Sequence, residues 1–236
     1  EQIMKEHGLT LVRVFDTNEH EPDKDVCLVK NEEGVTLVLR TGEVRTEGLF
    51  EDGFVGSTLV VPKRIAWSAD PAWELEEYLE APELIALTDV PQSEVEERMV
   101  KGFWEMQQVW DDVGLPPAEQ KAIEHAKGAL ELLTGQEKMR VLSVARRHET
   151  FLRGQYPSKW KYSKDNLLWL PNGKLGLIDL PRMGLRHWGY DLGWIYWPEW
   201  YTMTPEKWAD IEGYIERLEK LFALVEEQKP EGVELG

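Results

Sequence analysis

One segment of the chain, residues 138–187, has the residue types of an anion-binding site. It holds eleven basic side chains against three acidic ones, Glu149, Asp165 and Asp179, so its net charge is +8. The rest of the 236-residue chain holds 16 basic and 41 acidic side chains, a net charge of −25. The basic side chains could pair with nearby carboxylates on a solvated surface, or they could together hold an anionic ligand. The order of residues inside this basic segment bears on that choice.

A β-hairpin inside the basic segment would bring two polar residues together. Leu-Leu-Trp-Leu at 167–170 and Leu-Gly-Leu-Ile at 175–178 indicate two short strands, and the Pro-Asn-Gly between them is typical of a turn. The two arms of such a hairpin are nearly equal in length. We therefore expect Asn166 and Asp179, thirteen residues apart, to lie at the same end of it.

The elements before residue 80 indicate an antiparallel sheet. Short segments rich in β-branched and aliphatic residues lie at 9–15, 26–30, 35–40, 58–61 and 73–79. Residues 31–34, Asn-Glu-Glu-Gly, are typical of a hairpin connection, and a second turn is expected at 67–71, Trp-Ser-Ala-Asp-Pro. Residues 42–53 are ambiguous and could hold one short helix.

From residue 91 onward the spacing of apolar residues becomes helical. Val95, Met99, Phe103, Met106 and Trp110 recur at three- and four-residue steps, which places them on one face of a helix. Further helices are expected over 117–133, 136–152 and 205–227. The fold class is therefore α+β with two lobes. A small antiparallel β lobe covers residues 1–80 and ends in a hinge, and a larger, mostly helical lobe covers 81–236, with the hairpin at 166–180.

The hairpin resembles the catalytic hairpin of the aminoglycoside phosphotransferase and small-molecule kinase family, which has a protein-kinase-like fold. In that family an Asn opens the first strand and an Ile-Asp pair ends the second, as Asn166 and Ile178-Asp179 do here. The resemblance implies that Asn166 and Asp179 bind Mg²⁺, which bridges the phosphates of ATP and offsets their charge. It continues to Tyr190-Asp191-Leu192 and implies that Asp191 is a structural acid holding the catalytic loop. The specific motifs cover about residues 155–200.

Two parts of the family pattern are altered in this chain. Five residues before the Asn, the family has the Asp of a His-Gly-Asp triplet, which positions the substrate hydroxyl and can accept its proton. Lys159-Trp160-Lys161 stands there, and Lys161 cannot act as a carboxylate because it is cationic near neutral pH. The turn at 16–25, which should cover the phosphates, has no glycine and five acidic residues. The resemblance therefore predicts an impaired active site, that of a pseudokinase.

The resemblance also implies a set of ligand-binding residues. Arg40 stands where the family has a strand-borne lysine or arginine that pairs with the phosphates, and Glu77 and Tyr78 fall in the hinge, whose backbone would hold an adenine. An equally good interpretation is that Arg40 is an exposed arginine on a strand and binds no ligand. The helix acid expected to pair with it could be Glu43, Glu47 or Glu51. The residues expected to bind an anion, with a solvated face as the alternative for the lysines, are Lys159, Lys161, Lys164 and Arg182.

The expected function is that of a kinase-fold protein that is catalytically impaired and binds a nucleotide or another phosphorylated or anionic ligand in a basic cleft. ATP and Mg²⁺ are the candidate cofactors. The alternative is an active ATP- and Mg²⁺-dependent phosphotransferase that acts on a small-molecule hydroxyl with an atypical base. A small anionic ligand or a nucleotide is the expected partner, and the protein could in addition bind another protein.

Composition excludes other classes of function. The net charge of −17 and the pI near 4.8 argue against a nucleic-acid coat, although lysines with interleaved aromatics at 156–162 could grip a single strand. No run approaches the roughly 18 uncharged apolar residues of a membrane span, and residues 1–6 do not have the pattern of a signal peptide. The single cysteine, Cys27, cannot form an internal disulfide, which agrees with a cytoplasmic location.

Overall fold

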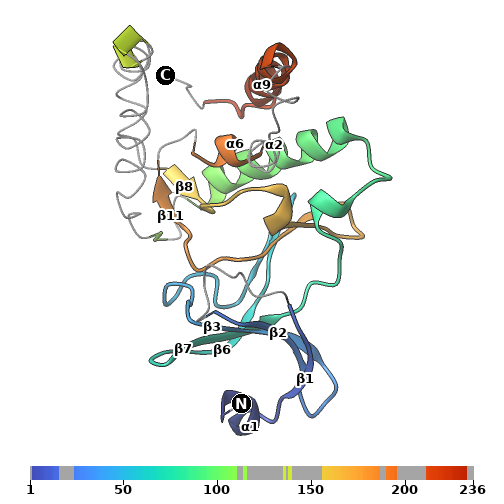
Figure 1. The fold of residues 1–236 in the computed structure, drawn as a ribbon, viewed down its shortest axis with the longest axis vertical. Coiled ribbons are helices and arrows are strands. Elements are labelled where there is room, and N and C mark those ends of the chain that lie inside the picture. The colour runs from blue at the N-terminus through green and yellow to red at the C-terminus, as the bar shows by residue number, and fades with distance from the viewer. Residues whose placement is uncertain are drawn as a thin grey trace.

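The computed structural model describes residues 2–15, 24–110, 114–115, 135–136, 138–139, 156–186, 190–195 and 211–232. The helix expected over 117–133 lies outside these residues, and the one expected over 136–152 lies almost wholly outside them. The described strands form three sheets (Figure 1).

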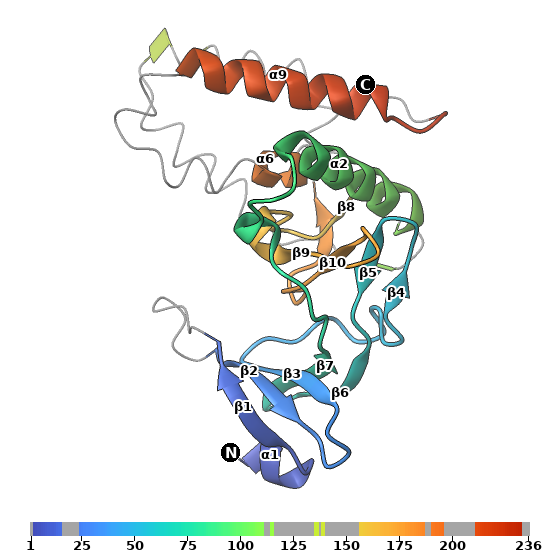
Figure 2. The same cartoon turned by 90° about the vertical axis from the view of Figure 1, so that its right-hand side faces the viewer.

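The first sheet lies at the end of the molecule opposite the long helices (Figure 2). Its neighbouring strands are all antiparallel, in the order β1 (Thr10–Val14), β2 (Val26–Lys30), β3 (Thr36–Thr41), β7 (Ala72–Glu77) and β6 (Arg64–Ala69). Successive side chains of a strand point to opposite faces. On β7, Trp73 and Leu75 therefore enter an apolar core against α1 (Gln2–Glu6), while Glu74 and Glu76 point to the other face. That second face carries Arg40.

At two places in this part of the chain the structure differs from the expectation. Trp67 and Ser68 belong to β6, because they pair with Glu74 and Trp73 of β7, and so the turn begins only after Ala69. Residues 42–53 form turns in place of a helix. Gly48 and Gly53 have φ angles of 79° and 72°, and a right-handed helix requires negative φ.

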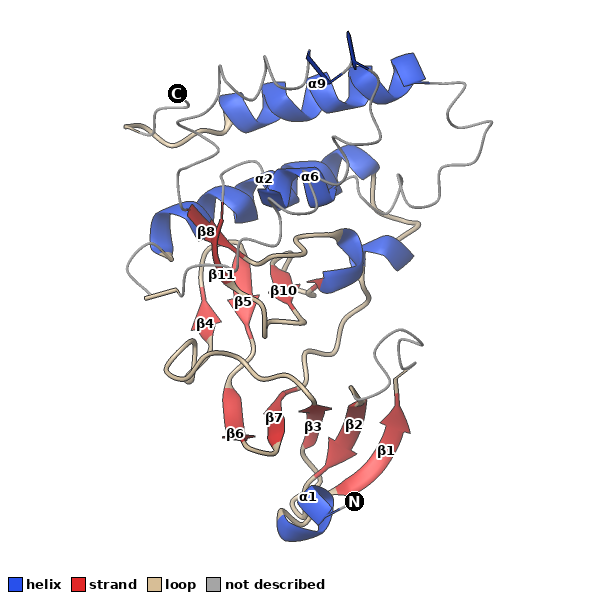
Figure 3. Ribbon diagram, turned by 60° about the vertical axis from the view of Figure 1, so that its left-hand side comes forward, coloured by secondary structure: helices blue, strands red, loops and turns tan. Residues whose placement is uncertain are grey.

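The second sheet joins distant parts of the sequence, in the order β4 (Phe54–Val55), β5 (Leu59–Val61), β10 (Leu175–Leu177) and β9 (Leu167–Trp169). β9 and β10 form the expected hairpin, and β5 runs parallel to β10 beside it. Figure 3 shows these strands between the first sheet and the helices. The segment expected at 58–61 therefore stabilises the hairpin and does not extend the antiparallel sheet.

The carboxylate of Glu105 holds the turn before β5 in place. It accepts the backbone N–H groups of Ser57, Thr58 and Leu59, at 2.5, 2.8 and 2.7 Å. On the other side, the Nζ of Lys174 donates to the carbonyl of Gly56 at 2.6 Å. The support of the hairpin is therefore fixed from both a helix and the hairpin's own turn.

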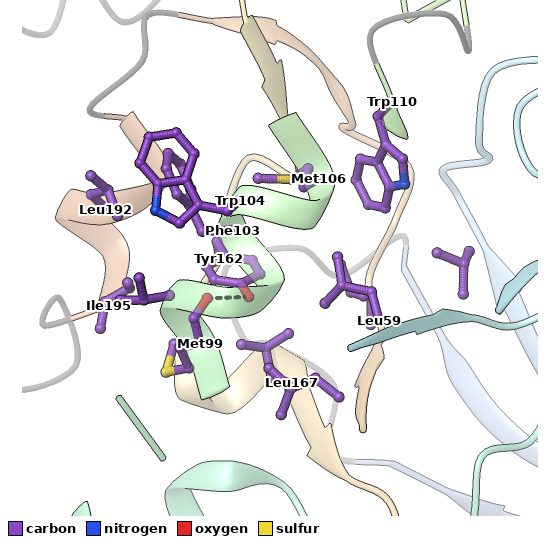
Figure 4. Close-up of a cluster of buried hydrophobic side chains, with 14 of the residues drawn as sticks. Leu59, Met99, Phe103, Trp104, Met106, Trp110, Tyr162, Leu167, Leu192 and Ile195 are labelled. Atoms are coloured by element: carbon purple, nitrogen blue, oxygen red, sulfur yellow. Dashed lines mark hydrogen bonds between the residues drawn. The ribbon is translucent and has the colours of Figure 1, made fainter. Parts of the chain in front are cut away.

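The helical core surrounds α2 (Gln92–Val109), α6 (Tyr190–Ile195) and α9 (Ile211–Glu227). The predicted apolar face of α2, from Val95 to Trp110, is buried. The hydroxyl of Tyr162 donates to the Met99 carbonyl at 2.9 Å, as Figure 4 shows. A Cβ on Gly102 would lie 2.5 Å from that hydroxyl, so glycine permits this contact. Through it, α2 supports the loop that precedes the hairpin.

The remaining described elements are short. A third sheet pairs β8 (Tyr156–Ser158) with β11 (Gly184–Arg186), and two 3₁₀ helices, η1 and η2, cover Leu84–Ala86 and Lys164–Asn166. β8 and β11 bracket the loop before the hairpin and the segment after it. In the part of the chain that the structure describes, no helix is long and apolar enough to cross a membrane.

Candidate functional site

Asn166 and Asp179 lie at the same end of the hairpin, as the sequence predicts. Leu167 pairs with Leu177, and the backbone N–H of Ile178 donates to the Asn166 carbonyl at 3.2 Å. The side-chain Nδ2 of Asn166 donates to the Lys161 carbonyl at 3.3 Å, which leaves its Oδ1 as the acceptor of that amide. Asp179 has a φ of 61°, a left-handed conformation that is uncommon outside glycine and often marks a functional position.

Several cations act on the carboxylate of Asp179, which is partly exposed. The Nη1 of Arg40 lies 3.7 Å from its Oδ1. Burial alone would raise the pKa of this carboxyl. The positive charges of Lys159, Arg40, Lys161 and Lys24 lower the pKa by more than burial raises it, so it lies below its ordinary value. The group therefore stays ionised, and it shares these cations with other acids, because Arg40 also pairs with Glu76 and Lys161 with Asp165.

Arg40 is held by an acid from a neighbouring strand. Its Nε donates to Oε1 of Glu76 on β7 at 2.9 Å, and both side chains are largely buried. Burial alone lowers the pKa of Arg40, while Glu76 and Asp179 raise it, and the net shift is upward. The resemblance left the partner open among Glu43, Glu47 and Glu51 on a helix, but no helix forms there and Arg40 pairs with Glu76 on a strand. The alternation of apolar and acidic residues from Trp73 to Glu76 could have predicted this partner, because it places both acids on the sheet face that carries Arg40.

A layer of buried ion pairs lies beside Arg40. Glu74 accepts Nε of Arg45 at 2.8 Å and Nη2 of Arg64 at 3.1 Å, and these three side chains are almost completely buried. The Nη2 of Arg45 also reaches Oε2 of Glu76 at 3.3 Å. Glu76 thus joins Arg40 to the layer, which fixes the position of the Arg40 guanidinium.

Lys159 lies inside the fold, with no exposed surface. Its Nζ donates to the backbone carbonyls of Asp179 at 3.0 Å and Lys161 at 3.4 Å. Burial lowers its pKa to about 8, while Asp179 and Asp191 act in the opposite direction. In this arrangement Lys159 braces the backbone at Asp179, and direct contact with a ligand, expected from the sequence, is not supported.

Lys161, which the sequence resemblance aligns with a catalytic Asp, forms an ion pair with Asp165. Its Nζ lies 2.8 Å from Oδ2 of Asp165, and Ser163 donates its hydroxyl to the other carboxylate oxygen. Burial raises the pKa of Asp165, but the Lys161 and Ser163 hydrogen bonds lower it below its ordinary value. Between the two lysines, Trp160 has a φ of 78°, which is uncommon outside glycine.

Asp191 binds the backbone of the loop that precedes the hairpin. It is buried, and its Oδ2 accepts the backbone N–H of Lys159 at 3.0 Å. Burial raises its pKa to about 7 even though Ser158, Arg186 and Lys159 lower it.

The other expected site residues are distributed around this centre. Arg182 forms a forked ion pair with Glu43, with Nη2 at 2.7 Å from Oε1, and its guanidinium lies 4.6 Å from the ring centroid of Trp160. Lys164 is buried in η2. The backbone N–H of Glu77 donates to the Lys63 carbonyl at 3.0 Å, so it is already used within the sheet. Tyr78 follows directly after β7.

Comparisons with known proteins identify the fold. No protein-family model matches the sequence, and no curated protein matches it. A choline kinase from Streptococcus pneumoniae matches with a TM-score of 0.56 and 15% identity, over 100% of this chain and 92% of the kinase. An aminoglycoside phosphotransferase from Streptomyces rimosus matches with a TM-score of 0.56 and 13% identity, over 99% of this chain and 90% of that protein. The chain has the protein-kinase-like fold.

A third protein with this kinase-like fold is a macrolide 2′-phosphotransferase from Brachybacterium faecium. It has a TM-score of 0.53 and 13% identity over 81% of this chain and 74% of its own. The Streptomyces rimosus enzyme is also known in complex with ADP and streptomycin, with a TM-score of 0.55 and 12% identity over 99% of this chain and 90% of that one. At such identities the likeness concerns the fold, and the activity must be judged from the residues of this chain.

The kinase-like fold implies Mg²⁺, and the residues present fit it. The acceptor oxygen of Asn166 and the ionised carboxylate of Asp179 are the hard donors that Mg²⁺ prefers. Within the described ranges, no group of three or more His, Cys, Asp or Glu side chains gathers as a metal site. Two protein oxygens are nevertheless a common complement for Mg²⁺ where substrate phosphates supply further ligands.

Proposed function

We propose that the chain is an aminoglycoside-phosphotransferase-like protein of kinase fold that binds a nucleotide or another phosphorylated ligand and is impaired in phosphoryl transfer. The observation that carries this proposal is the convergence of cations on Asp179: Nη1 of Arg40 lies 3.7 Å from its Oδ1, and Nζ of Lys159 donates to its backbone carbonyl at 3.0 Å. Lys161 also helps to lower the pKa of this carboxyl. A triphosphate is attracted to a site where positive charges converge from several elements. The cations that converge on Asp179 favour an anionic ligand over the solvated surface that was the alternative.

Arg40 would bind the phosphates. A guanidinium offers N–H groups in a planar fork that suits phosphate oxygens, and Glu76 holds this one in place before a ligand arrives. Asn166 and Asp179 would hold Mg²⁺, which would offset the charge of the phosphates beside the Asp179 carboxylate. The backbone at Tyr78 is the part of the predicted hinge that would face an adenine.

The impairment follows from the proton chemistry at Lys161. Transfer to a hydroxyl is aided by a base that positions that hydroxyl and accepts its proton. Lys161 presents a cationic donor at this position, and it is paired with Asp165. Asp165 is itself a weak base because its pKa is lowered. We expect bound nucleotide to be turned over far more slowly than in an active kinase.

Replacing Arg40 by glutamine should weaken ATP binding by about 10- to 100-fold, because a charge-assisted contact to phosphate contributes about 1.5–3 kcal/mol. Isothermal titration with ATP, with and without Mg²⁺, measures the effect. Arg98→Gln is the matched control, since Arg98 lies over Trp169, away from Asp179, with its guanidinium 5.8 Å from the ring centroid. Equal affinities in the wild type and Arg40→Gln, with both proteins folded by circular dichroism, would contradict the proposal.

The second candidate is an active phosphotransferase that uses an atypical base on a small-molecule hydroxyl. The observation in its favour is that Asn166 and Asp179 keep their places at one end of the hairpin. Incubation with Mg²⁺ and γ-labelled ATP over a mixture of small-molecule alcohols separates the two functions. The preferred proposal predicts no more labelled product than in Asp179→Asn. Rapid labelling that is lost in Asp179→Asn would establish the second candidate instead.

A further inference from the structure

Beside the proposed phosphate site, a carboxylate of the chain itself is bound between two further cations, Arg182 and Lys24. Arg182 donates Nε to Oε1 of Glu43 at 3.1 Å and Nη2 to the same oxygen at 2.7 Å. On the other side, the Nζ of Lys24 lies 2.8 Å from Oε2 of Glu43. One carboxylate therefore sits between two cations that come from separate parts of the chain.

These two cations border the site at Asp179. Lys24 lies near enough to Asp179 to contribute to its lowered pKa, and Arg182 is three residues beyond Asp179 in the sequence. The guanidinium of Arg182 is placed over the Trp160 ring, and its backbone carbonyl accepts Nη2 of Arg186 at 2.8 Å. Arg182 is thus held in position by contacts that do not involve Glu43.

The charge of this arrangement favours a different occupant. Lys24 and Arg182 together carry two positive charges, and Glu43 supplies one negative charge. A phosphate monoester carries about −1.5 to −2 charges at neutral pH and offers three acceptor oxygens. A guanidinium fork binds phosphate as well as it binds carboxylate. A phosphoryl group would therefore match this pair of cations more completely than Glu43 does.

We propose that Lys24 and Arg182 form a subsite for a dianionic phosphoryl group, and that Glu43 occupies it as an internal competitor until the ligand displaces it. This inference rests on the proposed function, because it concerns one edge of the same site. Displacement of Glu43 would also break a link between the loop after β3 and the segment after the hairpin. Ligand binding and the release of that link are then one event.

Glu43→Gln should bind inorganic phosphate and ATP about tenfold more tightly than the wild type, because the competing carboxylate is lost. Glu47→Gln is the matched control: Glu47 is exposed in the same loop, and its replacement changes the net charge equally. That control should stay within about twofold of the wild type. Adding Arg182→Gln to Glu43→Gln should remove the gain. Glu43→Asp, which keeps the charge and shortens the side chain, should give an intermediate gain and serves if Glu43→Gln does not fold.

The outcomes separate this inference from the proposed function. Should Glu43→Gln bind phosphate no better than Glu47→Gln, while wild-type ATP binding still depends on Arg40, the internal competitor is refuted and the nucleotide site stands. If neither the wild type nor any variant binds ATP or phosphate, both proposals are overturned. A gain in Glu43→Gln that survives Arg182→Gln would refute the subsite as defined here.

Discussion

Glu74→Gln should lower the free energy of unfolding by about 3–5 kcal/mol, the usual effect of removing one partner from a buried ion pair. Glu74 is fully buried and accepts the backbone N–H and Nε of Arg45, at 2.9 and 2.8 Å. It also accepts Nη2 of Arg64 at 3.1 Å. In the variant, the buried guanidinium groups of Arg45 and Arg64 lose the carboxylate charge that compensates them in the wild type. Urea denaturation monitored by tryptophan fluorescence measures the loss.

Glu77→Gln is the control for this prediction. Glu77 lies at the end of the same strand, is exposed, and accepts the backbone N–H of Lys63 at 3.1 Å, which a glutamine oxygen can also do. Its replacement should change stability by no more than about 0.5 kcal/mol. A loss in Glu74→Gln as small as that of the control would show that the ionic layer does not hold the sheet and Arg40 in place.

Asp191 should make the protein less stable as the pH rises from about 4 to 7. Burial raises its pKa in the folded state from 3.8 to about 7. Between these values the unfolded chain has lost the proton and the folded chain retains it, so the unfolded state is favoured increasingly as the pH rises. Asp191→Asn cannot ionise and should lack this slope. Across pH 4.5 to 7 the variant should gain about 2–4 kcal/mol relative to the wild type.

Urea denaturation at pH 4.5, 5.5, 6.5 and 7 tests this difference. Asp165→Asn is the control, because the pKa of Asp165 is lowered and the group is ionised in both states throughout this window. Its stability difference from the wild type should therefore stay constant with pH. Lys159, with a pKa lowered to about 8, titrates mainly above the window. Parallel pH profiles for the wild type and Asp191→Asn would contradict the buried, proton-retaining carboxyl.

The parts of the site that could be predicted from the sequence are those set by local structure. The hairpin needs only a turn and two short apolar arms, and these alone place Asn166 and Asp179 at the same end. The apolar face of α2 was likewise readable from its helical spacing. In both cases the residues that decide the outcome lie within about twenty positions of one another.

The contacts that the sequence did not reveal depend on pairing between distant segments. Glu76 meets Arg40 because β3 and β7 are neighbours in one register, and a one-residue slip would turn its side chain away. Glu43 and Arg182 are 139 residues apart, and no local pattern joins them. Lys159 looked like a ligand group by its charge, but its burial, which only the fold determines, makes it a brace for the backbone.

A crystal structure of the protein soaked with Mg²⁺ and ATP would show whether the site between Arg40 and Asp179 binds a nucleotide. We expect triphosphate density between Arg40 and Asp179, with an intact γ-phosphate and with the side chain of Glu43 released from Arg182. Nζ of Lys161 should stay with Asp165 or turn to a phosphate. ATP bound elsewhere, or no nucleotide density at millimolar concentration, would contradict the claim that this site binds a nucleotide.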